Sequence, residues 1–362
     1  MKGHLDTATG LVLTALTRPR DLLDLRPIQW DELLCRARNT RLLGRLGAEL
    51  DALGLLDRLP RKAVDQIRAE LTVTAENARM VRWEVNRISR ALREVGVPII
   101  LLKGAAYVLA ELPPATGRLS SDVDIMVPKE TLAQVEAALI RDGYEAVKLD
   151  SYDQRYYRTW MHELPPLCHR ERRTVVDVHH TILPESGRLR PDPRALTEAA
   201  RPLTDGLRIL SPPDLVLHSA AHLFQDGDLD GGLRDLVDLD LLLRHFGADP
   251  AFWEGLVPRA VELSLARPLY YALRYCQGLL GTPIPVVVQQ AARVAEPIAP
   301  VRSAMDALTC RAVTPDGWEG PSLRTGWARF LLYVRSHWLR MPPWLLTRHL
   351  VRKAMARAFP PT

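Results

Sequence analysis

Two aspartates in the run SSDVDIMV, Asp122 and Asp124, have a spacing that suits metal chemistry. In a strand, residues two apart point the same way, so both carboxylates project from one face while Val123, Ile125 and Val127 point into the core. Neighbouring carboxylates repel each other, and burying them is costly unless a cation compensates them. Mg²⁺ prefers oxygen ligands and completes its shell with water and substrate phosphates. The pair therefore predicts a Mg²⁺ site, with Mn²⁺ as a substitute, whereas a D-x-D alone can also be a solvated strand end.

A third acid, Asp177, lies in the strand-like run TVVDVHH, where it shares a face with Val175 and His179. If this strand lies beside the first, three carboxylates converge, which is enough for a two-metal site. Asp177 then ligates metal together with Asp122 and Asp124; otherwise it is a surface carboxylate. His179 either assists proton transfer or is an ordinary residue at a strand end.

These acids fall in a segment where strand and helix patterns alternate, which predicts an α/β unit over about residues 96–183. Short apolar runs predict its strands, and amphipathic stretches predict its helices. In chain order the expected elements are a strand at Val97–Leu102, a helix from Gly104 to Pro113-Pro114, a strand at Val123–Val127, a helix at Lys129–Asp142, and strands near Tyr144 and at Thr174–His180.

Helical patterns flank this unit on both sides. Apolar residues recur at three- and four-residue spacing over Leu22–Arg93, and Ser211-Pro212 is a typical helix start before a segment that carries His218 and His222. A further helix is expected over residues 232–247. The fold class expected is α+β, a mixed sheet with helices, divided into an N-terminal helical region (1–95), the α/β domain (96–185) and a C-terminal helical region with a basic amphipathic tail (186–362).

The run Lys103-Gly104…Arg118-x-Ser120-Ser121-Asp122-x-Asp124, followed by Asp177, resembles the DNA polymerase β-type nucleotidyltransferase superfamily. It is most similar to a group labelled uncharacterised nucleotidyltransferases, and it also resembles toxin-type members. The resemblance implies that Gly104 forms the phosphate turn and that Asp122 and Asp124 bind two metals. It also implies that Asp177 activates the attacking hydroxyl.

The same resemblance implies nucleotide contacts by Lys103, Gly104, Arg118, Ser120 and Ser121. The usual glycine-serine or glycine-glycine pair is here Lys103-Gly104-Ala105, so a serine contact to phosphate is missing. Lys103 either replaces that contact by its charge or is an ordinary residue at a strand edge. Arg118 either touches the nucleotide or pairs with Asp122.

His218 and His222 lie four residues apart, which is a metal-ligand spacing, but no acid of an H-E-x-x-H motif lies between them. We expect structural histidines, bonded to Asp235 or Asp238 of the next helix.

The whole chain of 362 residues has a net charge of +5, but residues 321–362 contain eight Lys or Arg and no Asp or Glu. This basic segment contacts nucleic acid, an anionic membrane or an acidic peptide, or else it packs on the core as an amphipathic helix pair. Four scattered cysteines without paired spacing argue against a zinc site or a disulfide framework. No apolar run is long enough to span a membrane, and the first twenty residues lack a cleavage signature, so a cytoplasmic protein is expected.

Taken together, the residues and the resemblance predict a metal-dependent nucleotidyltransferase that moves a nucleoside monophosphate from a nucleoside triphosphate, such as ATP, to a hydroxyl or phosphate acceptor. The acceptor is a small molecule, a peptide or an RNA such as tRNA. Two alternatives stay open: the same fold acting on a nucleotide-sugar or a phosphorylated peptide, and a non-catalytic nucleotide-binding scaffold.

Overall fold

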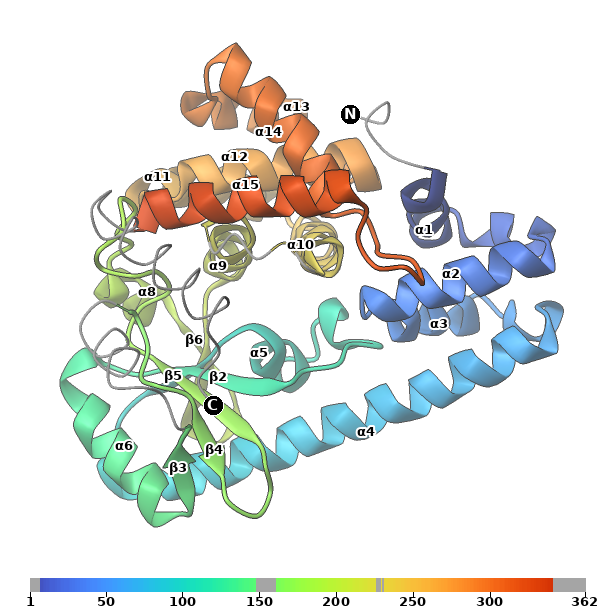
Figure 1. Ribbon diagram of the computed structural model, residues 1–362. Helices are drawn as coiled ribbons and strands as arrows, with labels where there is room; N and C mark the ends of the chain where they lie inside the picture. Colours follow the sequence, from blue (N-terminus) through green and yellow to red (C-terminus); the bar gives the residue numbers. More distant parts are fainter. Residues whose placement is uncertain (1–6, 148–160, 226–228, 230, 341–362) are drawn as a thin grey trace, which may run out of the picture.

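A computed structural model describes residues 7–147, 161–225, 229 and 231–340 of the chain. In this part of the chain, one mixed seven-stranded sheet is surrounded by helices (Figure 1), which confirms the expected α+β class. The strands are β1 (Ile99–Leu101), β2 (Asp122–Met126), β3 (Tyr144–Ala146), β4 (Leu167–His169), β5 (Val175–His179), β6 (Arg201–Pro202) and β7 (Leu207–Ile209), and their spatial order is β3-β4-β5-β2-β1-β7-β6.

The centre of the sheet is the β1–β2–β5 trio, on which the predicted acids lie. β2 pairs antiparallel with β1 and parallel with β5, and the β2–β5 register places Asp122 opposite Val175 and Asp124 opposite Asp177. The prediction that the two acidic strands lie side by side is therefore confirmed.

Several expected elements are shorter than their apolar patterns. The strand expected at Val97–Leu102 is reduced to β1, because Pro98 has no N–H to donate to the sheet and Leu102 already caps the next helix. The helix expected at Lys129–Asp142 begins with a 3₁₀ turn at Lys129–Thr131, and α6 (Leu132–Arg141) follows.

Two strands at the β6 edge come from beyond residue 185. β7 pairs parallel with β1, and β6 pairs antiparallel with β7. Both were expected to be part of a helical region, because strands of two and three residues carry too little alternation to be recognised. The sheet that holds the acids is thus completed by a segment from the C-terminal side.

The N-terminal region consists of α1 (Thr7–Thr17), α2 (Pro27–Asn39), α3 (Leu43–Ala52) and the long α4 (Arg61–Ala91). Figure 1 shows α4 passing beneath α3 at one end and beneath the sheet at the other, and its residues contact α3, α5 (Lys103–Leu109), α6 and β2. The chain leaves this region through Gly96, whose φ of 67° is in the left-handed region that glycine adopts easily.

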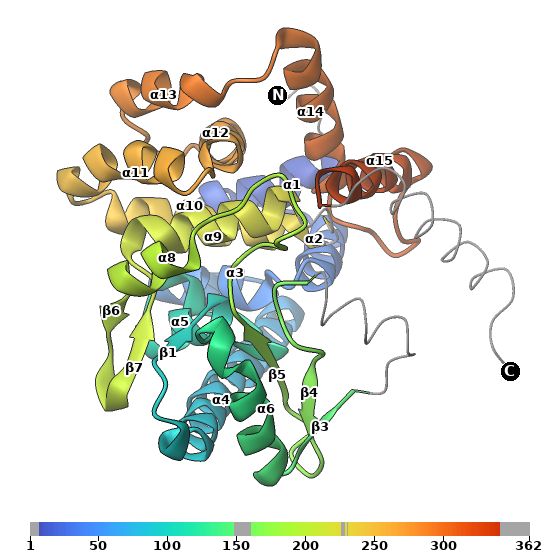
Figure 2. The same ribbon diagram turned by 90° about the vertical axis from the view of Figure 1, so that its left-hand side faces the viewer.

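The C-terminal region is helical after β7. Its helices are α9 (Pro212–Gln225), α10 (Gly232–Phe246), α11 (Pro250–Glu262), α12 (Ala266–Tyr275), α13 (Val286–Ala292), α14 (Ala299–Ala312) and α15 (Leu323–Arg340); α8 (Pro193–Ala199) precedes β6. α9 and α10 lie between the sheet and the α11–α12 pair (Figures 1 and 2). α9 begins where expected, with the N–H of Asp214 donating to the Ser211 hydroxyl at 3.4 Å.

For the basic segment, both a binding surface and packing on the core were weighed from the sequence, and several basic side chains of α15 point toward the protein. Arg329, Arg335 and Arg340 donate to the backbone carbonyls of Ala312, Phe224 and Gln225, respectively. The rest of the expected basic tail, 341–362, lies outside the described residues. No helix within the described ranges combines the length and the low polarity needed to cross a bilayer.

Candidate active site

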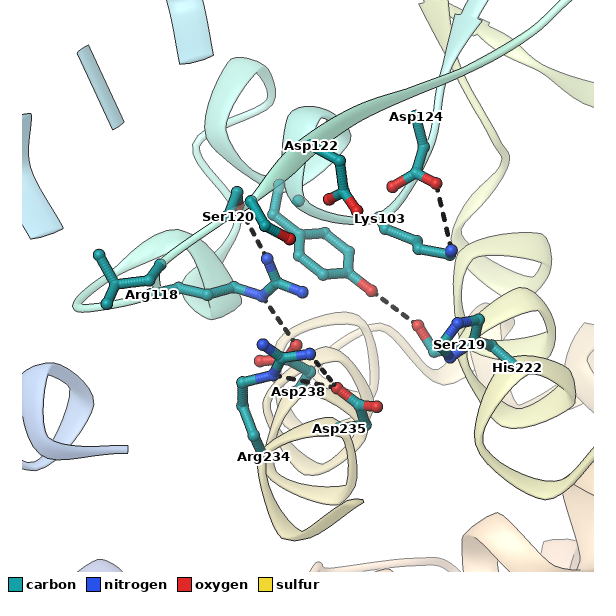
Figure 3. A pocket seen from close by; sticks show the side chains of 14 residues that line it. Lys103, Arg118, Ser120, Asp122, Asp124, Ser219, His222, Arg234, Asp235 and Asp238 are labelled. Carbon is teal, nitrogen blue, oxygen red and sulfur yellow. Dashed lines mark hydrogen bonds and ion pairs between the residues drawn. The ribbon is translucent and has the colours of Figure 1, made fainter. Parts of the chain in front are cut away.

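A pocket opens between the sheet and helices α9 and α10, directly over the turn that joins β1 to α5. Figure 3 shows the two predicted aspartates entering it from β2 and polar side chains of α9 and α10 entering from the opposite side. The pocket is lined by all but one of the residues that the sequence predicted for metal or nucleotide binding: Lys103, Gly104, Arg118, Ser120, Ser121, Asp122 and Asp124. The exception is Asp177.

The turn before α5 depends on two backbone features. Lys103 has a φ of 42°, a left-handed conformation that is uncommon for a residue with a Cβ and that persists only where surrounding structure holds it. At Gly104, an added Cβ would lie 2.3 Å from the Ser120 hydroxyl oxygen and 2.6 Å from a terminal nitrogen of Arg118. The glycine is required because the loop before β2 crosses the helix start at contact distance.

Lys103 reaches across this turn to the strand acids. Its ammonium nitrogen lies 3.1 Å from Oδ1 of Asp124, and the Asp124 side chain is almost fully buried. Burial by itself would raise the pKa of Asp124, but the charge of Lys103 and the hydrogen bond from His179 outweigh burial and hold that pKa far below its usual range. Asp124 is therefore ionised, and the basic group at this turn is paired with a carboxylate.

Asp177 lies behind Asp124, as its Cα partner on the parallel strand. Its Oδ1 is buried and has no hydrogen-bond partner within the described part of the chain. Burial, together with the negative charges of Asp124 and Glu163, raises the pKa of Asp177 to about 7. A buried oxygen without a partner beside two further carboxylates is the donor set that a hard divalent cation fits, because a cation removes both the repulsion and the unsatisfied acceptor.

Arg118 does not pair with Asp122, so the alternative weighed from the sequence is wrong. Its Nε lies 3.0 Å from Oδ2 of Asp238 on α10, and a terminal nitrogen donates to the Ser120 hydroxyl at 2.8 Å. Figure 3 shows the guanidinium between the loop and α10. The pair with Asp238 connects the loop before β2 to α10.

The other side of the pocket comes from α9 and α10. The Tyr107 hydroxyl is 2.6 Å from that of Ser219, and Arg234 donates to Asp235 at 2.9 Å. Burial opposes ionisation of Asp235, but the charges of Arg234, His222 and Arg118 lower its pKa. This side of the pocket therefore carries both positively and negatively charged side chains.

The two histidines of α9 have different surroundings. His222 lines the pocket, whereas His218 is buried and lies outside its lining. Burial lowers the pKa of His218 well below its usual value, as expected for a neutral structural histidine. Of the two acids expected as partners of these histidines, Asp238 pairs with Arg118, and Asp235 has its pKa lowered in part by the charge of His222.

One important contact, from Asn77 in the middle of α4, has no signal in the sequence. The Asn77 side chain accepts the N–H of Ser120 at 2.8 Å and donates to the carbonyl of Ser120 at 3.0 Å. This two-point contact holds the loop two residues before Asp122. A single asparagine in a long amphipathic helix is not recognisable as a site residue, because its partner is 43 residues away in the chain.

Comparison with known proteins agrees with this fold. A family model described as uncharacterised nucleotidyltransferase matches residues 26–281, which is more than half of the chain and includes every residue that lines the pocket. The chain therefore belongs to this nucleotidyltransferase family, and its activity is that of a transferase of phosphorus-containing groups. No curated protein and no solved structure matches the chain.

Proposed function

We propose that the chain transfers a nucleoside monophosphate from a nucleoside triphosphate to a hydroxyl or phosphate acceptor, in a reaction that requires a divalent cation. The observation that carries this proposal is the register of β2 and β5, in which Asp124 and Asp177 are direct partners and Asp122 lies two residues away on the same strand. Mg²⁺ is the best fit to three carboxylates, and Mn²⁺ prefers the same oxygen donors.

Asp122, Asp124 and Asp177 would hold the ions. Bound there, two cations would lower the pKa of the acceptor hydroxyl and neutralise the charge of the triphosphate and the leaving pyrophosphate. The chain's own residues would orient the reactants and stabilise charge from fixed positions, which is where most of the rate enhancement of phosphoryl transfer arises.

The triphosphate would lie over the β1–α5 turn. Lys103 and Arg118 bring positive charge to this end of the pocket, and the Ser120 and Ser121 hydroxyls line the same wall. The start of α5 adds backbone N–H groups that favour an anion. The nucleoside and the acceptor would then lie toward α9 and α10, where Ser219, His222 and Asp235 supply hydrogen-bonding groups.

The test is the Asp122→Asn variant, assayed with each of the four nucleoside triphosphates labelled at the α-phosphate, in cell extract with Mg²⁺. We expect label transfer by the wild type and a loss of at least about 100-fold in the variant, because removal of a single group that stabilises transition-state charge has effects of that order. Asp21→Asn is the matched control, because Asp21 is exposed, lies outside the pocket and pairs with Arg18. Unchanged transfer in Asp122→Asn with unchanged folding would refute the assignment.

Product mass separates the remaining possibilities for the transferred group. A nucleoside monophosphate adds about 300 Da or more, and a hexose adds about half of that mass. Calorimetry with the four triphosphates, with and without Mg²⁺, adds a readout that does not depend on the acceptor, since it measures nucleotide binding alone.

A further inference from the structure

A second group of metal-ligand side chains adjoins Asp124 through His179, whose Nε2 contacts the same Oδ1 atom as the Lys103 ammonium. It consists of His162, Glu163 and His179, which we call the His-Glu-His cluster. Backbone hydrogen bonds join residues 162–164 to the end of β5: His180 donates to the carbonyl of His162 and Leu164 to that of Val178, both at 2.9 Å. The cluster is thus built on paired backbone.

The three residues are close together; the two histidines are buried, and Glu163 is half-buried. One ligand atom from each lies within 4.8 Å of the ligand atoms of the other two. His162 is 8% exposed and His179 is 2% exposed, and the side chain of Glu163 is 16% exposed.

The position of the His179 ring indicates what the cluster binds. Nε2 lies 3.0 Å from Oδ1 of Asp124, and an ionised carboxylate only accepts hydrogen bonds, so Nε2 carries a proton. In a neutral imidazole, the lone pair is then on Nδ1. Nδ1 is 3.3 Å from Oε2 of Glu163, yet it is buried and forms no hydrogen bond in the described structure.

Nδ1 of His179 and Oε2 of Glu163 thus face each other at 3.3 Å, with a ligand atom of His162 close to both, and a cation placed among them would be within reach of all three. Zn²⁺ binds imidazole nitrogen at about 2.0–2.1 Å and carboxylate oxygen at about 2.0–2.2 Å, and tetrahedral geometry then separates the two ligand atoms by about 3.4 Å. The observed separation of 3.3 Å between Nδ1 and Oε2 matches this value.

We propose that the His-Glu-His cluster binds one divalent d-block cation, with Zn²⁺ as the best fit. Two imidazoles and one carboxylate are the ligand set of open zinc sites, whereas Mg²⁺ takes oxygen ligands and dehydrates reluctantly. This site is separate in chemistry from the three-aspartate site, and its existence does not depend on the proposed function.

Asp124 has a further role in this arrangement. Histidines that ligate metals almost always donate their other ring N–H to a carboxylate or carbonyl, which fixes the orientation of the ring. Asp124 occupies this position on His179, at 3.0 Å. The cation in the His-Glu-His cluster would hold His179 against Asp124 and so position that carboxylate for the neighbouring site.

The principal rival is a proton on His179 shared between Asp124 and Glu163, with no metal at all. The full chain would be stripped with a chelator and titrated with Zn²⁺ alone, and then with Co²⁺, in millimolar Mg²⁺ to fill oxygen-ligand sites. Bound metal would be measured by elemental mass spectrometry, and the visible spectrum of bound Co²⁺ would report whether its ligands are nitrogen and oxygen atoms.

We expect one Zn²⁺ per chain, with affinity at least about 10-fold lower in Glu163→Gln and in His162→Gln. Asp124→Asn removes only the carboxylate that accepts the other ring N–H of His179, so the Zn²⁺ affinity of this variant should fall by about 10–100-fold. His180→Gln is the matched control, because His180 is an equally buried neighbour of His179 that lies outside the cluster. Asp177→Asn should also retain Zn²⁺, so that loss of the three-aspartate site and loss of this site are distinguishable.

Absence of stoichiometric Zn²⁺ in the wild type would overturn the proposal in favour of the shared proton. Equal Zn²⁺ binding by the wild type, Glu163→Gln and His162→Gln would overturn it in favour of another location. Circular dichroism would establish that each variant is folded, and two independent ligand variants keep the test decisive if one of them does not fold.

Discussion

The contact between α4 and the loop before β2 leads to a prediction for Asn77→Ala. The substitution removes both hydrogen bonds between Asn77 and the backbone of Ser120, at 2.8 and 3.0 Å. Each such bond contributes about 1 kcal/mol net, and an unsatisfied buried group costs about 1–3 kcal/mol. Alanine recovers up to about 0.7 kcal/mol through its higher helix propensity. We therefore expect the free energy of unfolding to fall by about 2–3 kcal/mol.

The same substitution should affect turnover more than stability alone suggests. Ser120 immediately precedes Ser121 and Asp122, and a displacement of about 1 Å at a reacting group costs on the order of 100-fold in rate. We expect kcat to fall by about 10- to 100-fold at saturating nucleotide and Mg²⁺, under conditions where the variant is fully folded.

The assay is urea unfolding followed by tryptophan fluorescence, combined with steady-state turnover. Glu76→Ala is the matched control, because Glu76 is the preceding residue on α4 and forms a surface pair with Arg79; its effect should stay within about 0.5 kcal/mol. If Asn77→Ala also stays within about 0.5 kcal/mol and retains kcat, the inference that α4 positions the loop is refuted.

Two further predictions concern buried contacts. Gly104→Ala places a Cβ 2.3 Å from the Ser120 hydroxyl oxygen; we expect a loss of about 1–3 kcal/mol on unfolding and at least about 10-fold weaker nucleotide binding by calorimetry. Glu84→Gln breaks the buried pair with Arg172, at 3.0 Å, and should cost about 3–5 kcal/mol at pH 7. Burial raises the pKa of Glu84, but hydrogen bonds from Arg172 and other neighbours outweigh it and lower that pKa. The stabilisation is therefore present above the ordinary Glu pKa of about 4.3 and is lost as pH falls below it. Urea unfolding at pH 7 and pH 4 should thus show a smaller difference between wild type and variant at pH 4, and an equal difference would contradict the assignment.

Much of the central unit was predictable because its signals are local. The change from helical periodicity to short apolar runs near Val97 marked the first strand, and the two-residue spacing of Asp122 and Asp124 determined that both carboxylates project from one face. The short strands β6 and β7 were not predictable, because a few residues of alternation are indistinguishable from a loop without a sheet edge to pair with.

The sequence by itself determined the family, the fold class and the identity of the acids on β2, since these depend on residue type and on spacing within one element. Only the tertiary structure decided which groups meet: Asp177 beside Asp124, Asn77 against Ser120, and Arg118 with Asp238. Asn77 and Ser120 are 43 residues apart in the chain, and Arg118 and Asp238 are 120 residues apart. Such contacts depend on how whole elements pack and not on local preference. The position of His179 between Asp124 and Glu163 is of the same kind, and the metal site that we propose there could be inferred only from the folded chain.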